Sequence, residues 1–418
     1  MTNASTNWFD RTFTALTNRD FRVLWLGSMV TFVAFFMSTV AQGVVAFDLT
    51  GRNTAVGTVV FFQGVAQLVT NPIGGAYADR LDKKKIIFAC QAVSGAVFLS
   101  IGILVATGLI GIAFLSAGSF IVGMSFSFNG PARQAYVASI VDNERCGNAV
   151  ALNQVALNAS RMVGPLLGSA LIAWSLLGTD GTYFVLASMY AIALVLILML
   201  PSSAPRTGEG GVSIFGDIWA GVRYLGGNPQ LRALLMFFVP VMMLGFPYIT
   251  VLPGFAENAL GESTSSIGLL LFATAAGGLV ASIFVAGLAD SPKAHIVFQV
   301  AGVIFGLGLI ATGLMPNLWL AMAAMFVAGI GTGGFQTLNG ALILRGTSPA
   351  YFGRVMSLTM LAFAGYGLIA LPVGFIADTY GERATLVGMG TIVASVVVVL
   401  SPLFGRTLGD PAVSSGQD

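Results

Sequence analysis

Hydrophobic runs of membrane-spanning length recur along the whole chain, separated by short polar segments. The hydrocarbon core of a bilayer is about 30 Å thick, so a helix needs roughly 20 apolar residues to cross it. The runs that meet this requirement are 22–47, 54–78, 86–107, 110–132, 148–176, 182–201, 231–256, 264–289, 294–314, 317–344, 354–377 and 383–403. The pattern therefore predicts an all-α integral membrane protein with twelve transmembrane helices.

A longer polar stretch separates these spans into two sets of six. Residues 202–229 contain Pro, Gly and Ser, with a short amphipathic piece around 214–224. We predict an N-terminal six-helix half (1–201), a cytoplasmic linker with a short helix (202–229) and a C-terminal six-helix half (230–418). Residues 1–21 carry aromatic side chains among arginines, which is typical of an interfacial helix lying against the lipid head groups.

Composition agrees with a membrane protein and excludes an ordinary soluble enzyme. Of the 418 residues, 56% are hydrophobic and 9% are charged, and the mean hydropathy is +0.88. A soluble domain carries about 25% charged residues. The 53 glycines and 16 methionines suit close helix packing and adaptable surfaces. The net charge of +2 does not indicate nucleic acid, and we expect no such partner.

The distribution of Lys and Arg predicts the orientation. With the N-terminus inside, sixteen of the nineteen fall in cytoplasmic segments, only Arg52 and Arg383 fall outside, and Arg161 lies within a span. Positive residues accumulate on the cytoplasmic side of a membrane. We therefore expect both termini in the cytoplasm and the spans in a bacterial inner membrane. Cys90 and Cys146 then lie near the cytoplasmic side, where free thiols are expected.

The two halves also resemble each other in sequence. The matched positions are Asp79 with Asp290, Asn129 with Asn339, and Pro165 with Pro372, at offsets of 211, 210 and 207 residues. Three matches in order indicate a duplicated six-helix unit. Transporters built from internal repeats place their substrate site at the repeat interface near the membrane midplane.

Several motifs resemble those of the major facilitator superfamily. The segment after span two is similar to its signature, with Asp82 where the family usually has Gly. The matching residues there are Gly75, Asp79, Arg80, Lys83 and Lys84. Stretches similar to the enterobactin-exporter and macrolide-efflux branch are 18–25, 47–51, 130–135, 164–168 and 353–357. The resemblance implies two pseudo-symmetric halves that alternate access around a central cavity.

The resemblance also implies roles for particular residues. A conformational gate is expected at Gly75, Asp79, Arg80, Arg133 and Arg354. In the family, the acid lies at the start of span eleven and pairs with nearby arginines in the outward-open state. Gly164, Pro165 and Gly168 resemble an exporter motif that shapes helix packing and limits leak. Many proton-coupled exporters have an Arg before a Gly in span four, whereas Gly123 follows Ser119, Phe120, Ile121 and Val122 here.

Polar side chains recur at helical spacing in four spans, which places each set on one helix face. The cavity residues that we predict from these faces are Phe35, Ser38, Gln42, Gln63, Gln67, Asn158, Arg161, Thr332, Gln336 and Asn339. Such faces normally point to the bundle interior. Each amide alone also fits an interhelical hydrogen bond, worth about 0.6 kcal/mol on average; the four faces together favour a shared polar cavity.

Two charged residues are candidates for substrate binding and coupling. A charge at mid-membrane costs roughly 2.5–3.5 kcal/mol on insertion scales, so Arg161 is a candidate for holding an anionic substrate, or it has a structural partner. Asp48 is a candidate proton carrier, or a turn residue at a helix end. His295, the only histidine, begins span nine, where a solvated or capping role fits.

The repeat and the spans predict a secondary transporter, and the resemblance implies that it exports a small amphipathic molecule, siderophore-like or drug-like, by proton antiport. The alternatives are an importer of a small metabolite and a lipid flippase. A membrane-embedded enzyme is disfavoured by the scarcity of His, Cys and mid-membrane acids. The chain has no Gly-x4-Gly-Lys phosphate-binding loop, and we expect no metal or cofactor. The expected partners are the substrate, protons and the bilayer, around a monomer.

Overall fold

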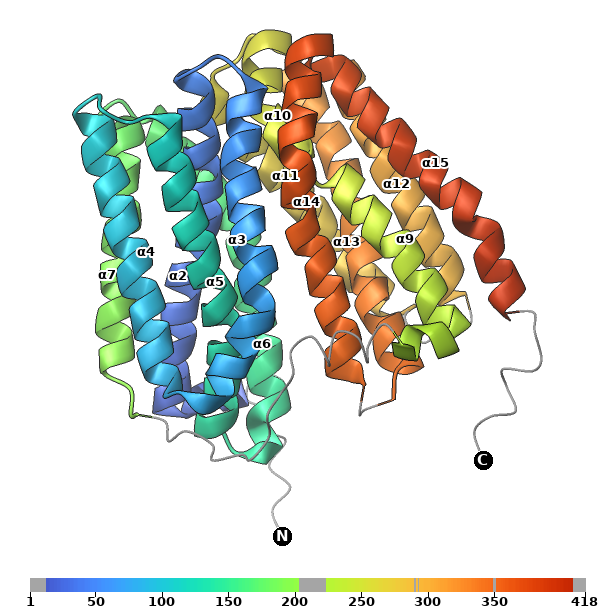
Figure 1. Ribbon diagram of the computed structural model, residues 1–418, viewed down its shortest axis with the longest axis horizontal. Helices are drawn as coiled ribbons and strands as arrows, with labels where there is room; N and C mark the ends of the chain where they lie inside the picture. The colour runs from blue at the N-terminus through green and yellow to red at the C-terminus, as the bar shows by residue number, and fades with distance from the viewer. Residues whose placement is uncertain (1–12, 203–222, 289–290, 292, 349–350, 409–418) are drawn as a thin grey trace, which may run out of the picture. The chain divides into compact units, whose positions relative to one another are not determined.

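A computed structural model describes residues 13–202, 223–288, 291, 293–348 and 351–408, without the side chains of 72–80, 143–144, 286, 352–354, 357 and 403–408. Within these ranges the chain is helical and has no strand (Figure 1). The predicted interfacial helix falls largely on residues 1–12, outside the described residues, and only a 3₁₀ turn at Thr14–Thr17 follows. Residues 214–222 of the predicted linker helix and Asp290 also lie outside them, and residues 223–227 are helical.

The long helices coincide with the predicted spans. They are α2 (Arg19–Asp48), α3 (Asn53–Arg80), α4 (Lys83–Ala106), α5 (Ile112–Ile140), α6 (Asn143–Ala173), α7 (Gly178–Leu198), α9 (Pro229–Gly245), α10 (Tyr248–Gly254), α11 (Ile267–Ala286), α12 (Ala294–Leu314), α13 (Leu318–Gly346), α14 (Phe352–Tyr380) and α15 (Glu382–Leu408). Eleven spans of the described residues are long and apolar enough to cross a membrane. The remaining predicted span, 54–78, is helical as α3 but is not among those eleven.

One predicted span is not a single helix. The run 231–256 forms α9, then α10 and a π-helical turn at Phe255–Ala259. Pro247 lies between α9 and α10, where its missing N–H cannot continue the hydrogen-bond ladder of α9. The three pieces still continue as one candidate span, Pro229–Ala259.

Local residues account for several helix ends. Asp82, Asn228 and Asn317 each accept a hydrogen bond from a backbone amide in the first turn of the helix that follows, at 2.9, 3.2 and 3.0 Å. These are side-chain caps that satisfy otherwise unpaired amides. At the other end of a helix, Gly381 has φ of 86°, a backbone conformation that favours glycine, and it ends α14.

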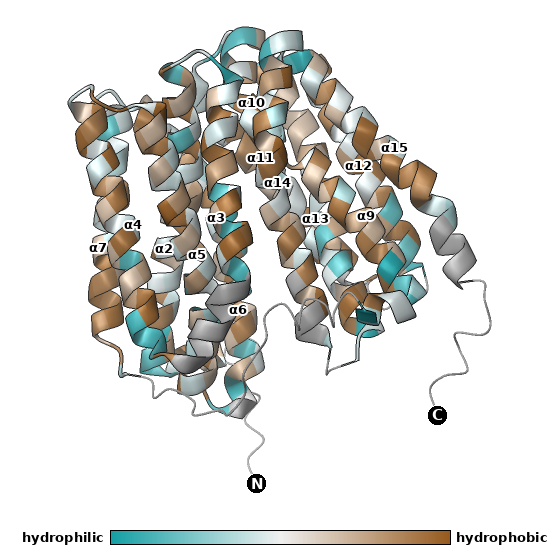
Figure 2. Cartoon of the chain, viewed as in Figure 1, coloured by the Kyte–Doolittle hydropathy of each residue, from teal (hydrophilic) through white to brown (hydrophobic). Residues whose placement is uncertain are grey.

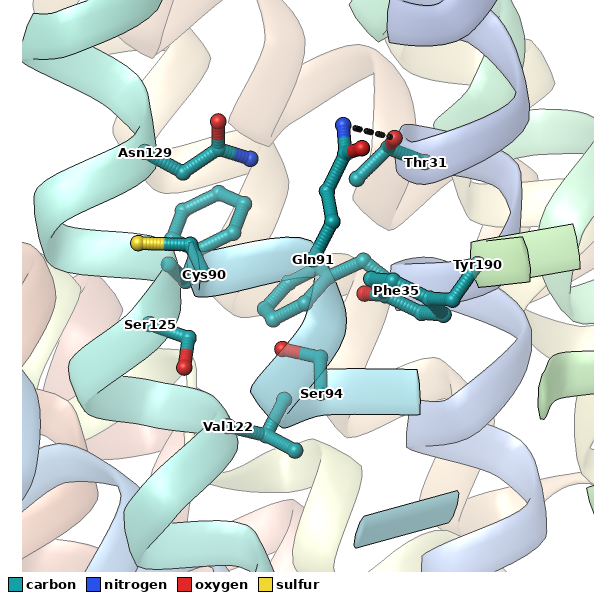
Figure 3. Close-up of a pocket in the computed structure, with 10 residues that line it drawn as sticks. Thr31, Phe35, Cys90, Gln91, Ser94, Val122, Ser125, Asn129 and Tyr190 are labelled. Atoms are coloured by element: carbon teal, nitrogen blue, oxygen red, sulfur yellow. Dashed lines mark hydrogen bonds between the residues drawn. The ribbon is translucent and has the colours of Figure 1, made fainter. Parts of the chain in front are cut away.

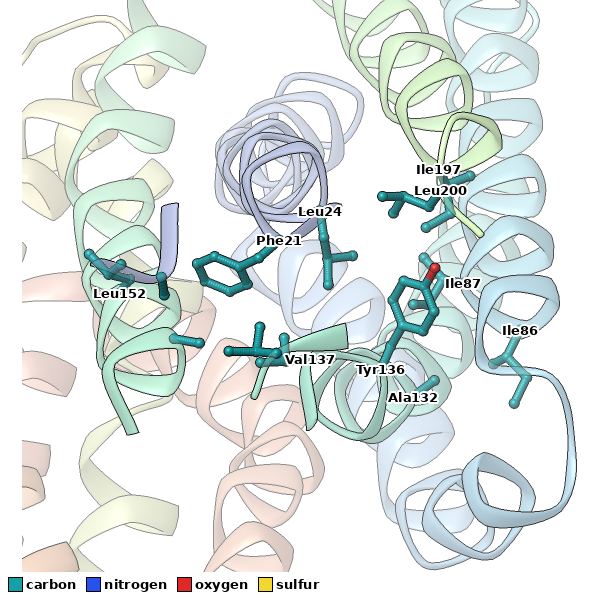
Figure 4. Packing of buried hydrophobic residues seen from close by; sticks show 13 residues of the cluster. Phe21, Leu24, Ile86, Ile87, Ala132, Tyr136, Val137, Leu152, Ile197 and Leu200 are labelled. Carbon is teal, nitrogen blue, oxygen red and sulfur yellow. The ribbon is translucent and has the colours of Figure 1, made fainter. Parts of the chain in front are cut away.

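The chain forms two compact units, which we call unit 1 (1–41 and 69–211) and unit 2 (42–68 and 212–418). At one end of unit 1, apolar side chains from α2, α4, α5, α6 and α7 form a continuous cluster (Figure 4). It includes Phe21, Leu24, Ile86, Ile87, Ala132, Tyr136, Val137, Leu152, Ile197 and Leu200. The predicted division at the linker stays a prediction, because these units are defined by packing and not by the sequence repeat.

Unit 2 is packed through glycines and aromatic rings. A methyl group on Gly277 would lie 2.0 Å from the carbonyl oxygen of Phe326, and one on Gly329 would lie 2.0 Å from that of Thr274. The backbones of α11 and α13 are therefore nearly in contact, which only small residues allow. Beside them, the Phe298 and Phe335 rings stack with centroids 4.2 Å apart.

Hydrophobic residues recur along the long helices (Figure 2), and many large apolar side chains are exposed. Phe284 of α11 is 74% exposed, Trp319 of α13 73%, and Leu176, in the turn between α6 and α7, 80%. Such exposure would be a liability in water, but lipid tails are as apolar as these side chains. The chain is a multi-pass membrane protein.

Candidate functional site

Arg133, predicted as a gate residue, is buried inside unit 1. Only 2% of this side chain on α5 is exposed. Its Nη1 donates a hydrogen bond to the Ser28 hydroxyl of α2, and its Cζ lies 5.6 Å from the centroid of the Phe32 ring. Nε has no partner among the described residues. The guanidinium therefore connects α5 to α2 by a directional bond and a cation–π contact.

Gln91 of α4, absent from the predicted set, completes this network. Its Nε2 lies 3.3 Å from the Thr31 hydroxyl oxygen, to which it donates (Figure 3). Turning the amide by 180° instead lets its nitrogen donate to the Ala193 carbonyl oxygen at 3.0 Å and its oxygen accept from Arg133 Nη2 at 3.1 Å. Hydrogen-bonding logic favours this second orientation, because it satisfies both ends of the amide. Gln91 is the only amide of span three, which was the signal available in the sequence.

A small pocket lies beside Gln91 (Figure 3). Its lining residues are Thr31, Phe35, Cys90, Gln91, Ser94, Val122, Ser125, Phe126, Asn129 and Tyr190. Its volume is about 10 Å³, near the lower limit for one water molecule. Asn129 Oδ1 is buried and has no partner in the described part of the chain. The pocket thus suits a single water that donates to Asn129, and it is too small for an exported molecule.

The other predicted gate residues cannot be placed in this network. The backbones of Gly75, Asp79 and Arg80 continue α3, and that of Arg354 belongs to α14. Their side chains lie outside the described residues. Pairing of Asp79 with Arg133 or Arg354 stays a prediction.

The predicted cavity residues of unit 1 lie on two helices. On α2, the Phe35 ring stacks on Phe126 with centroids 4.1 Å apart, and the buried Ser38 hydroxyl donates to the Phe35 carbonyl oxygen at 2.7 Å. On α6, Asn158 and Arg161 are exposed. The Arg161 Cζ lies 5.6 Å from the Phe36 ring centroid. Unit 1 thus separates an aromatic and buried face on α2 from an exposed polar face on α6.

The predicted exporter motif is a helix-packing element in unit 1. A methyl group on Gly164 would lie 2.9 Å from the Val33 carbonyl oxygen, and one on Gly168 would lie 3.1 Å from that of Met37. Pro165 lies between them, inside α6. The two glycines bring α6 against the backbone of α2, so a larger side chain at either position would push the helices apart.

The remaining predicted cavity residues belong to unit 2. Gln42, Thr332 and Asn339 are buried, whereas Gln63, Gln67 and Gln336 are half-buried. Asn339 Oδ1 has no hydrogen-bond partner among the described residues. The cavity that would combine these residues with those of unit 1 stays a prediction.

Asp48, the candidate proton carrier, lies in a group of carboxylates at one end of unit 2. Its side chain lies near Thr264 and Glu257. Asp378 and Glu382, two further acids at this end, accept hydrogen bonds from the first residues of α3. These contacts join positions more than 320 residues apart, so no local sequence pattern indicates them. The described residues contain no group of three His, Cys, Asp or Glu able to hold a metal.

Comparison with known proteins gives a consistent result over nearly the full length. Residues 10–404 match a family described as transmembrane secretion effectors. Macrolide efflux protein A of Streptococcus pyogenes is 21% identical over 389 residues, covering 91% of this chain and 94% of that protein. The enterobactin exporter EntS of Shigella flexneri is 25% identical over 392 residues, covering 92% of each.

The fold also matches a solved transporter structure. It is that of a bacterial homologue of the human lysosomal transporter Spinster, in an inward-facing and unoccupied conformation. The TM-score is 0.76 with 14% identity, covering 94% of this chain and 98% of that one. At this identity the likeness shows the fold alone, and it confirms the all-α major facilitator fold expected from the sequence.

Proposed function

Because the chain belongs to the transmembrane secretion effector family of the major facilitator superfamily, we propose that it exports a small amphipathic molecule from a bacterium. The family and the relatives are membrane transporters and not enzymes. Both relatives carry efflux or export in their names. We propose that it works as a monomer in the inner membrane, and the distribution of its Lys and Arg residues supports an orientation with both termini in the cytoplasm.

The observation that carries the proposal is the exposed Arg161 near the middle of α6. It lies eighteen residues after the first residue of the helix, roughly 27 Å at 1.5 Å per residue. An arginine at this depth does not face lipid without a large cost, and such residues line water-filled cavities. Gln154 and Asn158 are exposed on the same helix. The α6 face therefore suits a water-filled transport cavity.

The chemistry of this face suits an oxygen-rich, anionic or partly anionic substrate. A guanidinium offers five N–H donors in a planar fork that matches carboxylates and catecholate-like oxygens. The aromatic rings of Phe35 and Phe36 lie on the neighbouring helix α2 and suit the apolar part of an amphipathic molecule. A siderophore-like compound combines both properties, and a drug-like compound is the second candidate.

We propose that protons drive export, with Asp48 as the candidate carrier. A coupling group must titrate while it alternates between aqueous faces, and carboxylates serve this role in many transporters. Asp48 lies at the end of α2, near Thr264 and Glu257. An imposed pH gradient across proteoliposomes should drive uptake of the exported compound. A gradient that drives no transport would remove the antiport proposal and leave export itself standing.

Everted membrane vesicles test the role of Arg161. Vesicles energised with lactate should accumulate labelled enterobactin or erythromycin when they contain the native protein. Arg161→Ala should reduce accumulation of the anionic siderophore at least tenfold while the amount of protein in the membrane stays the same. Arg232→Ala, which removes an exposed charge from α9, is the matched control and should transport normally. Normal export by Arg161→Ala would contradict the assignment, and vesicles that never fill would favour an importer.

A further inference from the structure

The first turn of α3 is capped by a carboxylate from α14. Asp378 Oδ1 accepts a hydrogen bond from the Asn53 amide at 2.6 Å. Its Oδ2 accepts from the Thr54 amide at 2.9 Å and from the Thr54 hydroxyl at 2.5 Å. The opening amides of a helix have no partner within it and are usually satisfied by the preceding residue. Here that residue is Arg52, which has no acceptor in its side chain, so the cap comes from 324 residues away.

A second carboxylate joins the same end of α3 to α15. Glu382 Oε1 accepts from Asn53 Nδ2 at 2.9 Å and from Asn258 Nδ2 at 2.7 Å. Asn53 is 1% exposed and Glu382 9%. Buried polar groups lose much more when their partners are removed than exposed groups do. These two bonds therefore depend on α3 staying in place.

Further along α3, after the residues that bond these carboxylates, the backbones of α3 and α14 are in contact. A methyl group on Gly57 would lie 2.6 Å from the Ala370 carbonyl oxygen, and one on Gly64 would lie 2.6 Å from the Gly367 Cα. Asn53 and Gly64 are eleven residues apart, about three helical turns. At these two glycines the backbones are too close for a larger side chain, and we call this contact between α3 and α14 the seam.

The acceptor side of the contact is held firmly within unit 2. The guanidinium of Arg383, next to Glu382, donates to the carbonyl oxygens of Gly313, Met315 and Ala259 at 3.1, 2.6 and 2.8 Å. These bonds tie the first turn of α15 to the ends of α12 and of the π-helical turn. The Arg383 guanidinium is therefore bonded to backbone carbonyls, which fix the start of α15 to its neighbours, so separation at this contact would move α3 relative to α15.

We propose that Asn53, Thr54, Asp378 and Glu382 form an outer latch that holds α3 against α14 and α15 while the transporter is closed to the outside. The inference rests on the proposed export cycle and on the predicted orientation, in which these helix ends face outward. The bonded residues come from the two predicted halves of the chain, so opening this side breaks every bond of the latch at once. Release of substrate then requires α3 to lose its cap.

A buried reporter cysteine tests the latch without knowledge of the substrate. Cys90 and Cys146 are first replaced by Ser, and Ala370→Cys places a thiol at the seam, where the native side chain is fully buried. Intact cells are then treated with a membrane-impermeant maleimide. Asp378→Ala should raise the labelling rate of this thiol at least fivefold. Glu262→Ala, which removes an exposed acid from the same predicted side, should leave the rate unchanged.

The outcomes separate the latch from the export proposal. Equal labelling in Asp378→Ala and Glu262→Ala, with both proteins monodisperse in detergent, would overturn the latch. Absence of transport for every compound tried would leave the labelling result unaffected and would count against the proposed substrate class alone. A combined Asp378→Ala and Glu382→Gln variant should label faster than either single variant, because each carboxylate holds α3 separately.

A cross-link gives an independent test. Thr54→Cys and Asp378→Cys, combined in the chain without native cysteines, should form a disulfide on oxidation, because the native side chains are in hydrogen-bond contact. Export should stop when the disulfide forms and recover when a reductant is added. The oxidant should not change export by either single-cysteine variant. A disulfide that forms without stopping export would overturn the latch, and so would the failure of any disulfide to form.

Discussion

The interiors of the two units differ at positions that the sequence repeat matches. With the offset of 210 residues that relates Asn129 to Asn339, Arg133 corresponds to Ile343 and Ser125 to Phe335. Unit 1 has a buried guanidinium and a polar pocket at these positions. In unit 2, Ile343 and Phe335 are fully buried, and the Phe335 ring stacks on others. One pattern of helices thus accommodates two kinds of interior.

The difference shows that the two interiors are stabilised in different ways. Polar groups buried in a membrane protein need partners from neighbouring helices, and the resulting bonds are directional. Aromatic and glycine contacts depend on close fit and lose energy when a gap opens. We therefore expect unit 1 to tolerate changes that keep its hydrogen bonds, and unit 2 to tolerate changes that keep its volume.

The largest effect should follow from giving unit 2 the charge of unit 1. Ile343→Arg places a guanidinium in an apolar interior, where the buried Phe335 ring stacks on its neighbours at the position that matches Ser125. The insertion cost of an arginine, roughly 2.5–3.5 kcal/mol, adds to overpacking of about 1–3 kcal/mol. We expect loss of the monodisperse peak in detergent size-exclusion chromatography.

A neighbouring substitution controls for the added charge. Leu344 is 61% exposed near the end of α13, so an arginine there can extend to the interface. Leu344→Arg should remain monodisperse. If Ile343→Arg behaves like Leu344→Arg, the two interiors are less different than the packing indicates.

A smaller loss should follow from removing one ring of the unit 2 interior. Phe335→Ala deletes the ring between Phe238 and Phe298 and should cost about 3–5 kcal/mol of unfolding free energy. Ser125→Ala, at the matched position of unit 1, removes only a hydroxyl and should shift the thermal midpoint much less. Equal shifts for the two variants would mean that the ring stack contributes little to unit 2.

The smallest loss of stability should come from replacing Gln91, whose side-chain amide connects α4 to its neighbouring helices in unit 1. Gln91→Leu removes its bonds to Arg133 and Ala193, and we expect a loss of about 1–3 kcal/mol because these groups are left unpaired. Gln91→Glu keeps an acceptor for the guanidinium and should recover most of the thermal midpoint. If Gln91→Leu and Gln91→Glu have the same thermal midpoint, the bond from Arg133 to this side chain does not stabilise unit 1.

Helix positions could be predicted closely because the bilayer itself sets the length of an apolar run. The span expected at 294–314 is α12 to the residue, and 317–344 differs from α13 by one residue at the start and two at the end. The break at Pro247 was missed because proline is tolerated within many transmembrane helices when neighbours satisfy the freed groups. Only the packing around α9 and α10 decides whether such a proline bends or interrupts a helix.

Candidate residues were harder to predict than helices. The polar spacing on α6 indicated Arg161, and the structure leaves that side chain exposed on its helix. Helical spacing says which residues share a face but not which face meets a partner, so the cavity role of Ser38, whose hydroxyl donates to the Phe35 carbonyl oxygen, stays a prediction. Gln91 was missed because a single amide in an apolar span has no periodic pattern.

By itself, the sequence determined that the chain crosses a membrane through repeated apolar helices and that it belongs to this superfamily, because these depend on local composition and on motifs within one segment. Only the tertiary structure decided which groups form hydrogen bonds with the side chains of Arg133, Gln91, Asp378 and Glu382. Their partners lie on other helices, up to 329 residues away. A hydrogen bond requires two atoms within about 3 Å, and only the packing of helices brings such distant residues that close.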